Sequence, residues 1–135
     1  MMHIALIGIG GAVGSILRFL LSNFATRVNA GMPIGDLSHV LTGTLIANAL
    51  GSFLMGFMWS TGATRLHLTA QARDAITIGL LGGFTTFSTF ANDTRVLFAS
   101  GLQWMALLNI ILHNTLAILG AFAGFALGQR LGPAK

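Results

Sequence analysis

The sequence predicts an all-α membrane protein with four transmembrane helices. Its 135 residues are 54% hydrophobic and only 7% charged, whereas a soluble domain is about 25% charged. A soluble fold of this size needs polar side chains to cover its surface, and this chain lacks them. Four apolar stretches are each near the roughly 20 residues that a spanning helix requires. We expect helices at about 4–24, 40–60, 75–100 and 104–127, forming one transmembrane domain over residues 1–135.

The first apolar stretch combines small residues with one charge. Gly10, Gly14 and Arg18 follow one another at four-residue spacing. Small residues at this spacing let two helices approach closely. An arginine within a membrane costs at least a few kcal/mol. Arg18 therefore either reaches toward the membrane surface or faces a watery vestibule, where it would attract anions.

The second apolar stretch carries a polar face. Thr44, Asn48 and Ser52 lie at i, i+4 and i+8, so a helix places them on one side. Asn48 is near the middle of the span, where a carboxamide needs hydrogen-bond partners. Two interpretations stay open: an interhelical hydrogen bond, or an NH₂ group that donates to a permeating anion.

The third apolar stretch contains the most informative segment, Gly82–Phe90, which reads GGFTTFSTF. Glycine costs about 1 kcal/mol relative to alanine in a helix, and Ser and Thr compete for backbone partners. We therefore expect the third helix to break near Gly82–Thr86, in the middle of the membrane. Broken-helix carbonyls can bind cations, and half-helix N-termini favour anions.

The phenylalanines of this segment recur every third residue, at Phe84, Phe87 and Phe90. An aromatic ring is positive at its edge and negative on its face. A ring turned edge-on can therefore meet a small anion, with hydroxyl groups replacing water around it. The alternative is that these rings only fill space between helices.

The fourth apolar stretch places Asn109 and His113 one turn apart, ahead of a glycine repeat that includes Gly124. His113 is the one histidine within an expected span. It is either a neutral, hydrogen-bonded side chain or a group that titrates. The other histidines lie in separate segments, so the spacing predicts no histidine metal site.

The distribution of basic residues gives a weak orientation signal. If four helices span the membrane, four Lys and Arg residues lie on one side, namely Arg65, Arg73, Arg130 and Lys135, against Arg27 and Arg95 on the other. Such a small bias allows insertion in one direction or in both. Two oppositely inserted copies could together form a symmetric pathway, as inverted repeats do within single chains.

Three segments resemble the Fluc-type fluoride channels, the CrcB family. Gly82–Phe90 is similar to the signature of that family, and Gly10–Gly14 with Arg18 is similar to its first helix. Gly43–Leu45 with Asn48 is similar to its second. The resemblance implies an antiparallel, dual-topology homodimer in the bacterial inner membrane. It implies two pores that let fluoride leave the cytoplasm passively, which lowers fluoride toxicity.

The resemblance also implies roles for individual residues. The fluoride pore would contain Asn48, Phe87, Phe90, Ser88 and Thr89, and the vestibule would contain Arg18 and Asp93. Asp93 stands where the family has a glutamate. A structural sodium ion at the dimer centre would be held by the backbone carbonyls of Gly82 and Thr85. Ala117 and Ala121 stand where the fourth helix of the family has hydroxyl groups, so its contribution to the pore differs here.

Other classes of protein fit the sequence less well. A small multidrug-type four-helix exporter needs a membrane carboxylate, and Asp93 lies near the far end of the third helix. An intramembrane hydrolase built on Ser88, His113 and Asp93 would need a nucleophile beside its base, and the sequence has no Gly-x-Ser-x-Gly motif. A non-conducting subunit would not need the polar faces. Since the features of a hydrolase are missing, we do not expect an enzyme. The chain also has no cluster of Lys and Arg for nucleic acid, so we expect no nucleic-acid partner.

Overall fold

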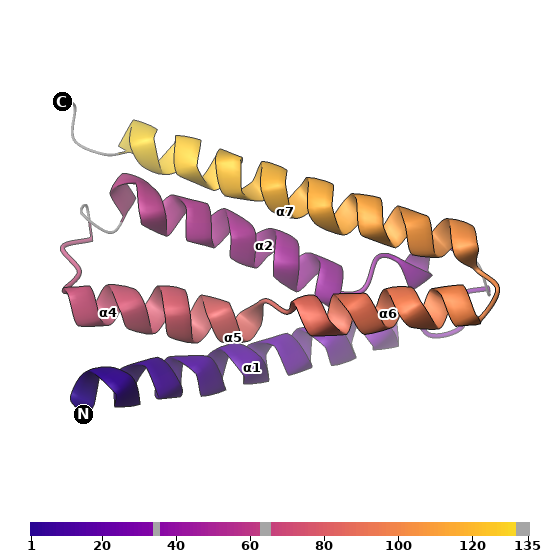
Figure 1. The fold of residues 1–135 in the computed structure, drawn as a ribbon, viewed down its shortest axis with the longest axis horizontal. Coiled ribbons are helices and arrows are strands. Elements are labelled where there is room, and N and C mark those ends of the chain that lie inside the picture. Colours follow the sequence, from indigo (N-terminus) through magenta and orange to yellow (C-terminus); the bar gives the residue numbers. More distant parts are fainter. Residues whose placement is uncertain (34–35, 63–65, 132–135) are drawn as a thin grey trace.

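The computed structural model describes residues 1–33, 36–62 and 66–131, and every regular element in these ranges is helical (Figure 1). Arg65 and Lys135, two of the residues considered for orientation, lie outside the described residues. The elements are α1 (Met2–Val28), η1 (Leu37–His39), α2 (Gly43–Phe57), η2 (Met58–Gly62), α4 (Ala70–Asp74), η3 (Ala75–Leu81), α5 (Gly82–Phe84), α6 (Phe87–Ala99) and α7 (Gln103–Leu131).

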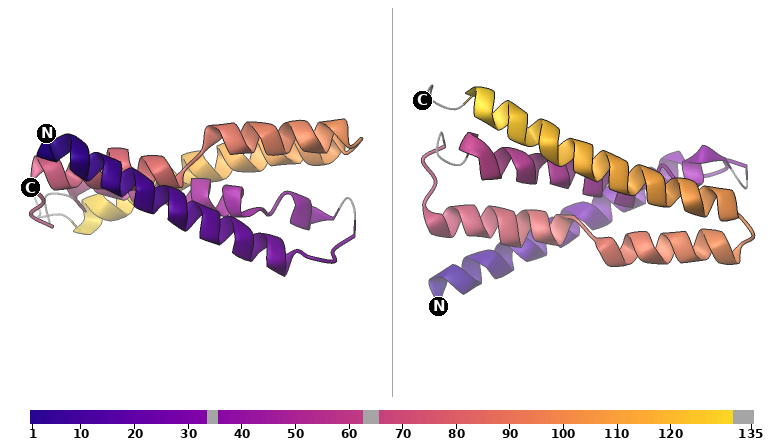
Figure 2. Two further views of the ribbon diagram at one scale, coloured as in Figure 1. Left: turned by 90° about the horizontal axis from the view of Figure 1, so that it is seen from below. Right: turned by 45° about the horizontal axis from the view of Figure 1, so that its top comes forward.

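The elements form two pairs of neighbouring segments. One pair is α2 with α7, and the other is α1 with the continuous run formed by η3 and α5. The two members of each pair run in the same direction, and the two pairs run in opposite directions (Figures 1 and 2). The chain therefore passes along the molecule four times. This arrangement agrees with the four helices expected from the sequence.

Glycines allow the close approach within each pair. A Cβ atom on Gly14 of α1 would collide with the carbonyl oxygen of Leu80 and lie 2.8 Å from the Phe84 nitrogen. A Cβ atom on Gly124 of α7 would collide with the Phe53 carbonyl oxygen. Both contacts are backbone against backbone, as small-residue spacing predicts for membrane helices.

The helix boundaries differ from the sequence expectation at several ends. Helix α2 begins at Gly43 rather than near residue 40, because the Thr42 hydroxyl accepts a hydrogen bond from the Leu45 amide (3.3 Å) and caps the helix. Helices α1 and α7 extend beyond their expected ends. Among the described residues these two are long and apolar enough, uninterrupted, to cross a membrane.

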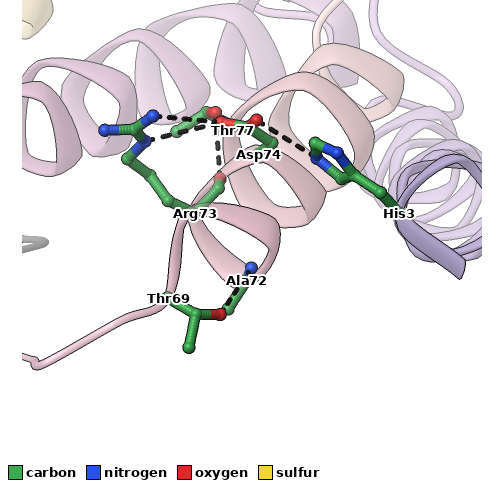
Figure 3. A network of polar contacts seen from close by, with 6 residues as sticks. All are labelled: His3, Thr69, Ala72, Arg73, Asp74 and Thr77. Carbon is green, nitrogen blue, oxygen red and sulfur yellow. Dashed lines mark hydrogen bonds and ion pairs between the residues drawn. The ribbon is translucent and has the colours of Figure 1, made fainter.

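A polar network connects the start of α1 to α4 (Figure 3). The His3 imidazole lies 3.2 Å from the Asp74 carboxylate, and the Arg73 guanidinium lies 3.4 Å from it. Arg73 also stands over the Trp59 ring, with 5.6 Å between guanidinium carbon and ring centroid. The Thr77 hydroxyl donates to the Arg73 carbonyl (3.0 Å). These contacts connect α1, η2 and α4 at one end of the molecule.

Large apolar side chains cover much of the outside. Phe19, Phe24 and Phe122 are 63%, 66% and 71% exposed in the single chain. Apolar surface of this extent is rare on soluble monomers and marks contact with lipid or with another protein. The outer surface thus agrees with the all-α membrane fold that the composition predicts.

Candidate functional site

Two extended residues separate α5 from α6. Thr85 has φ −84° and ψ 154°, and Thr86 has φ −154° and ψ 121°. Gly82 and Gly83 are helical and belong to α5. The Thr86 hydroxyl accepts a hydrogen bond from the Thr89 amide (3.3 Å) and so caps the start of α6.

Asn48 of α2 holds this extended segment through two hydrogen bonds. Its Nδ2 donates to the Thr86 carbonyl (3.0 Å), and its Oδ1 accepts from the Thr86 amide (2.8 Å). The carboxamide thereby pairs with both backbone groups of Thr86, whose amide has no helical partner. Of the two interpretations left open by the sequence, the interhelical hydrogen bond is the contact present in the structure.

Arg18 of α1 reaches the same region from the other side. Its Nε donates to the carbonyl oxygen of Gly83 (3.2 Å), and its side chain is half-buried. Gly83 lies near the C-terminal end of the helical run that finishes with α5, where carbonyl groups are unpaired. A positive charge is favourable beside such an end.

The carbonyls of Gly82 and Thr85 have lost their helical partners. The Thr86 amide, which would close the helical bond to Gly82, donates to Asn48 instead. The Thr89 amide, which would close the bond to Thr85, donates to the Thr86 hydroxyl. Two carbonyl oxygens at a helix interruption suit a hard cation that prefers oxygen ligands. The residues expected to hold sodium are therefore chemically suited to it.

A cavity of about 560 Å³ lies beside the interruption, between α2, α6 and α7. The break supplies Gly82, Thr85 and Thr86, and α2 supplies Asn48 and Ser52. Helix α7 contributes a largely apolar wall. Its lining residues are His113, Asn114, Ala117, Ile118 and Ala121.

The two phenylalanines of α6 line this cavity and contact each other. The ring centroids of Phe87 and Phe90 are 5.3 Å apart and the ring planes meet at 63°, an edge-to-face arrangement. Phe87 is 77% exposed in the single chain, whereas Phe90 is buried. The Phe90 ring also lies 4.5 Å from the His113 ring, tilted by 34°.

Ser88 and Thr89 lie at the start of α6 and do not line the cavity formed by the described residues. Each hydroxyl oxygen is 3.2 Å from the Thr86 hydroxyl. The three hydroxyl groups thus form a cluster around the helix cap. Thr86 was not among the expected site residues, although a threonine ahead of a new helix is a recognisable capping signal.

Asp93 stands further along α6, outside the cavity wall. Its half-buried carboxylate lies near the Thr44 side chain of α2 and interacts electrostatically with His113. His113 is buried, and its Nδ1 is 3.1 Å from the Asn109 carbonyl oxygen. Asn109 in turn donates to the Thr94 hydroxyl (2.8 Å). These five side chains come from three helices, and only Asn109 and His113 were placed together by their spacing in the sequence.

Comparison with known proteins places this chain in a family. A family model described as CrcB-like protein, Camphor Resistance (CrcB), matches residues 5–125. The chain is 40% identical over 125 residues to the fluoride-specific ion channel FluC of Shewanella frigidimarina, covering 92% of this chain and 94% of the relative. It is 42% identical over 132 residues to the FluC protein of Parabacteroides distasonis, covering 97% and 96%. It is 38% identical over 131 residues to that of Agrobacterium fabrum, covering 97% and 99%. The expected resemblance is confirmed, and the chain belongs to the CrcB family.

Proposed function

We propose that this protein is a fluoride-selective channel that lets fluoride leave the cytoplasm passively across the bacterial inner membrane, which it spans several times. The observation that carries the proposal is the cavity beside the interruption between α5 and α6, lined by the edge-to-face pair Phe87 and Phe90. The names of the relatives, fluoride-specific ion channel, identify the ion. A channel moves ions without a chemical reaction, so the protein is not an enzyme.

The cavity offers the kind of contacts that a dehydrated fluoride ion needs. Fluoride holds water strongly, so a pore must replace that water with hydrogen-bond donors and positive ring edges. Asn48 has two N–H groups, and its pairing with Thr86 uses one of them. The other N–H is proposed to meet fluoride beside Phe87 and Phe90, while the hydroxyl groups of Ser88 and Thr89 continue the polar path.

The working unit is proposed to be an antiparallel homodimer of oppositely inserted copies. Three features support it: the weak bias of basic residues, the 77% exposure of the pore residue Phe87, and the thin four-pass fold of one chain. A second copy would cover Phe87 and complete the pore. In this arrangement the Thr85–Thr86 interruption lies at the middle of the bilayer, and Arg18 and Asp93 lie along the approach to the pore.

A structural sodium ion is proposed at the centre of that dimer. Gly82 and Thr85 would hold it through their backbone carbonyls, because the amides that would pair with these carbonyls in a helix donate to other groups. A bound cation would neutralise the negative ends of these carbonyls. Asn48 and Arg18 hold the surrounding backbone in place through Thr86 and Gly83.

The small multidrug-type exporter is not supported. A proton-coupled exporter of cations needs a carboxylate at its binding site. Within the described residues the cavity wall contains no acidic side chain, and Asp93 lies outside it. The relatives are named as fluoride channels.

Fluoride efflux from liposomes that contain only this protein tests the proposal. We expect efflux on a fluoride electrode, no chloride efflux, and loss of most fluoride flux in Phe87→Ile, because the ring edge is removed. Phe98→Ile is the matched control, since Phe98 is also exposed on α6 but lies outside the cavity. Undiminished flux in Phe87→Ile would exclude the ring-edge role.

A further inference from the structure

His113 is a buried histidine with one nitrogen unpaired. Its side chain is 4% exposed, and its Nε2 has no hydrogen-bond partner among the described residues. Burying a polar atom without a partner is unfavourable, so such an atom calls for an explanation. The residue lines the cavity proposed to conduct fluoride. Asn109 does not supply the partner, because its backbone carbonyl engages Nδ1 and its side-chain NH₂ group donates to Thr94.

The hydrogen bond to Asn109 determines where the proton of the neutral ring lies. Nδ1 is 3.1 Å from the Asn109 backbone carbonyl, which can only accept. Nδ1 therefore carries the proton, and Nε2 of the neutral ring presents a lone pair. A lone pair repels an anion. Protonation converts Nε2 into an N–H donor and gives the ring a positive charge.

Burial disfavours the charged form of the ring, and two groups packed around His113 offset this effect. The Phe90 ring lies against it at 4.5 Å, and an aromatic ring stabilises a neighbouring cation. Asp93 of α6 is the acidic group that interacts with it, and a carboxylate favours the protonated imidazole. Helix α2, residues 43–57, contains no charged side chain. On α7 itself, Ala117 and Ala121 add no hydroxyl donor to the cavity wall.

We propose that His113 is a proton-dependent fluoride-binding residue, whose imidazolium Nε2–H donates to fluoride in the cavity and makes conduction rise as the pH falls. The inference rests on the proposed channel function. The sign follows from the tautomer: the donor exists when the ring is protonated and disappears when it is neutral. Fluoride bound there would also supply the missing partner of Nε2.

Fluoride efflux should be measured from liposomes between about pH 4.5 and pH 8, a range that extends well below the ordinary imidazole pKa of about 6.5. Protein-free liposomes supply the leak of undissociated hydrogen fluoride, which is subtracted at each pH. We expect the wild-type flux to increase several-fold from the high to the low end. His113→Gln should show no increase. His3→Gln should keep the increase, because His3 pairs with Asp74 at the end of the molecule, away from the cavity.

Two further variants keep the test decisive. His113→Phe retains a ring against Phe90 and lacks both nitrogens, so it too should be insensitive to pH if His113→Gln fails to fold. Asp93→Asn should keep a pH-dependent rise. Absence of fluoride efflux at every pH would overturn the proposed function itself. Efflux that does not change with pH, or a rise that survives in His113→Gln and His113→Phe, would overturn the role of His113 alone.

Discussion

The α2–α7 pair and the interruption between α5 and α6 are built in opposite ways. Along α2 and α7, glycines such as Gly124 bring two backbones into direct contact. At the interruption, side chains from other helices, Asn48 and Arg18, hold the backbone by hydrogen bonds. The first region depends on shape, and the second depends on polar partners. The steric contact leaves no space between the two backbones, whereas the interruption leaves the Gly82 and Thr85 carbonyls without their helical partners.

The largest effect on stability is expected at the interruption, for Asn48→Ala. A hydrogen bond contributes about 1 kcal/mol net, and this change removes two partly buried ones. We expect unfolding in detergent to be easier by about 2 kcal/mol or more. Hydrogen–deuterium exchange should also increase in peptides that contain Thr86.

Asn114→Ala is the matched control for Asn48→Ala. Asn114 lines the same cavity, but its side chain donates to the Ile110 carbonyl of its own helix (2.7 Å). It should change neither stability nor exchange at Thr86 appreciably. Equal effects of the two alanine variants would contradict the assignment of Asn48 as the residue that holds the extended segment.

A somewhat smaller effect is expected in the α2–α7 pair, for Gly124→Ala. The added Cβ would collide with the Phe53 carbonyl, and overpacking of this kind costs about 1–3 kcal/mol. The thermal unfolding midpoint in detergent should fall. Gly8→Ala is the control, because a Cβ at Gly8 would meet nothing within 4 Å in the chain. Equal unfolding midpoints for the two variants would show that the close backbone contact between α2 and α7 does not require a glycine at position 124.

The smallest of these effects is expected for Arg18→Gln. The change removes the Nε donor to the Gly83 carbonyl, and a hydrogen bond from a charged group contributes about 1.5 kcal/mol. Arg95→Gln is the comparison, since Arg95 donates to Asn92 of its own helix (3.1 Å). Unfolding midpoints in detergent should separate the two. A fall no larger than that of Arg95→Gln would show that Arg18 does not support the break.

The sequence predicted a break near Gly82–Thr86, and the extended residues are Thr85 and Thr86. The two glycines stay helical. A Cβ on Gly83 would lie 2.5 Å from the Gly11 carbonyl oxygen, so close packing against α1 explains why a glycine stands there. The intrinsic cost of a helical glycine, about 1 kcal/mol, is small enough for packing to offset. Helix propensity alone therefore identified the segment that contains the break, but it did not identify which residues of that segment are extended.

The candidate site could be predicted in part. Asn48, Phe87 and Phe90, expected in the pore, line one cavity together with Gly82 and Thr85, which were expected to hold sodium. Their roles remain proposals. Ser88 and Thr89 lie around the cap of α6 instead, because the Thr86 hydroxyl accepts from the Thr89 amide and lies 3.2 Å from the hydroxyl oxygens of both residues. Their part in conduction remains a proposal.

Composition and spacing by themselves determined that this chain forms membrane helices, that small residues bring those helices close, and that the third is irregular. These features follow from local periodicity and from the shortage of charge. The tertiary structure decided which groups meet at the irregular segment. Asn48 and Thr86 are 38 residues apart, and Arg18 and Gly83 are 65 apart. Contacts over such separations depend on how the helices are rotated and offset against each other, and that is settled only when the whole fold packs.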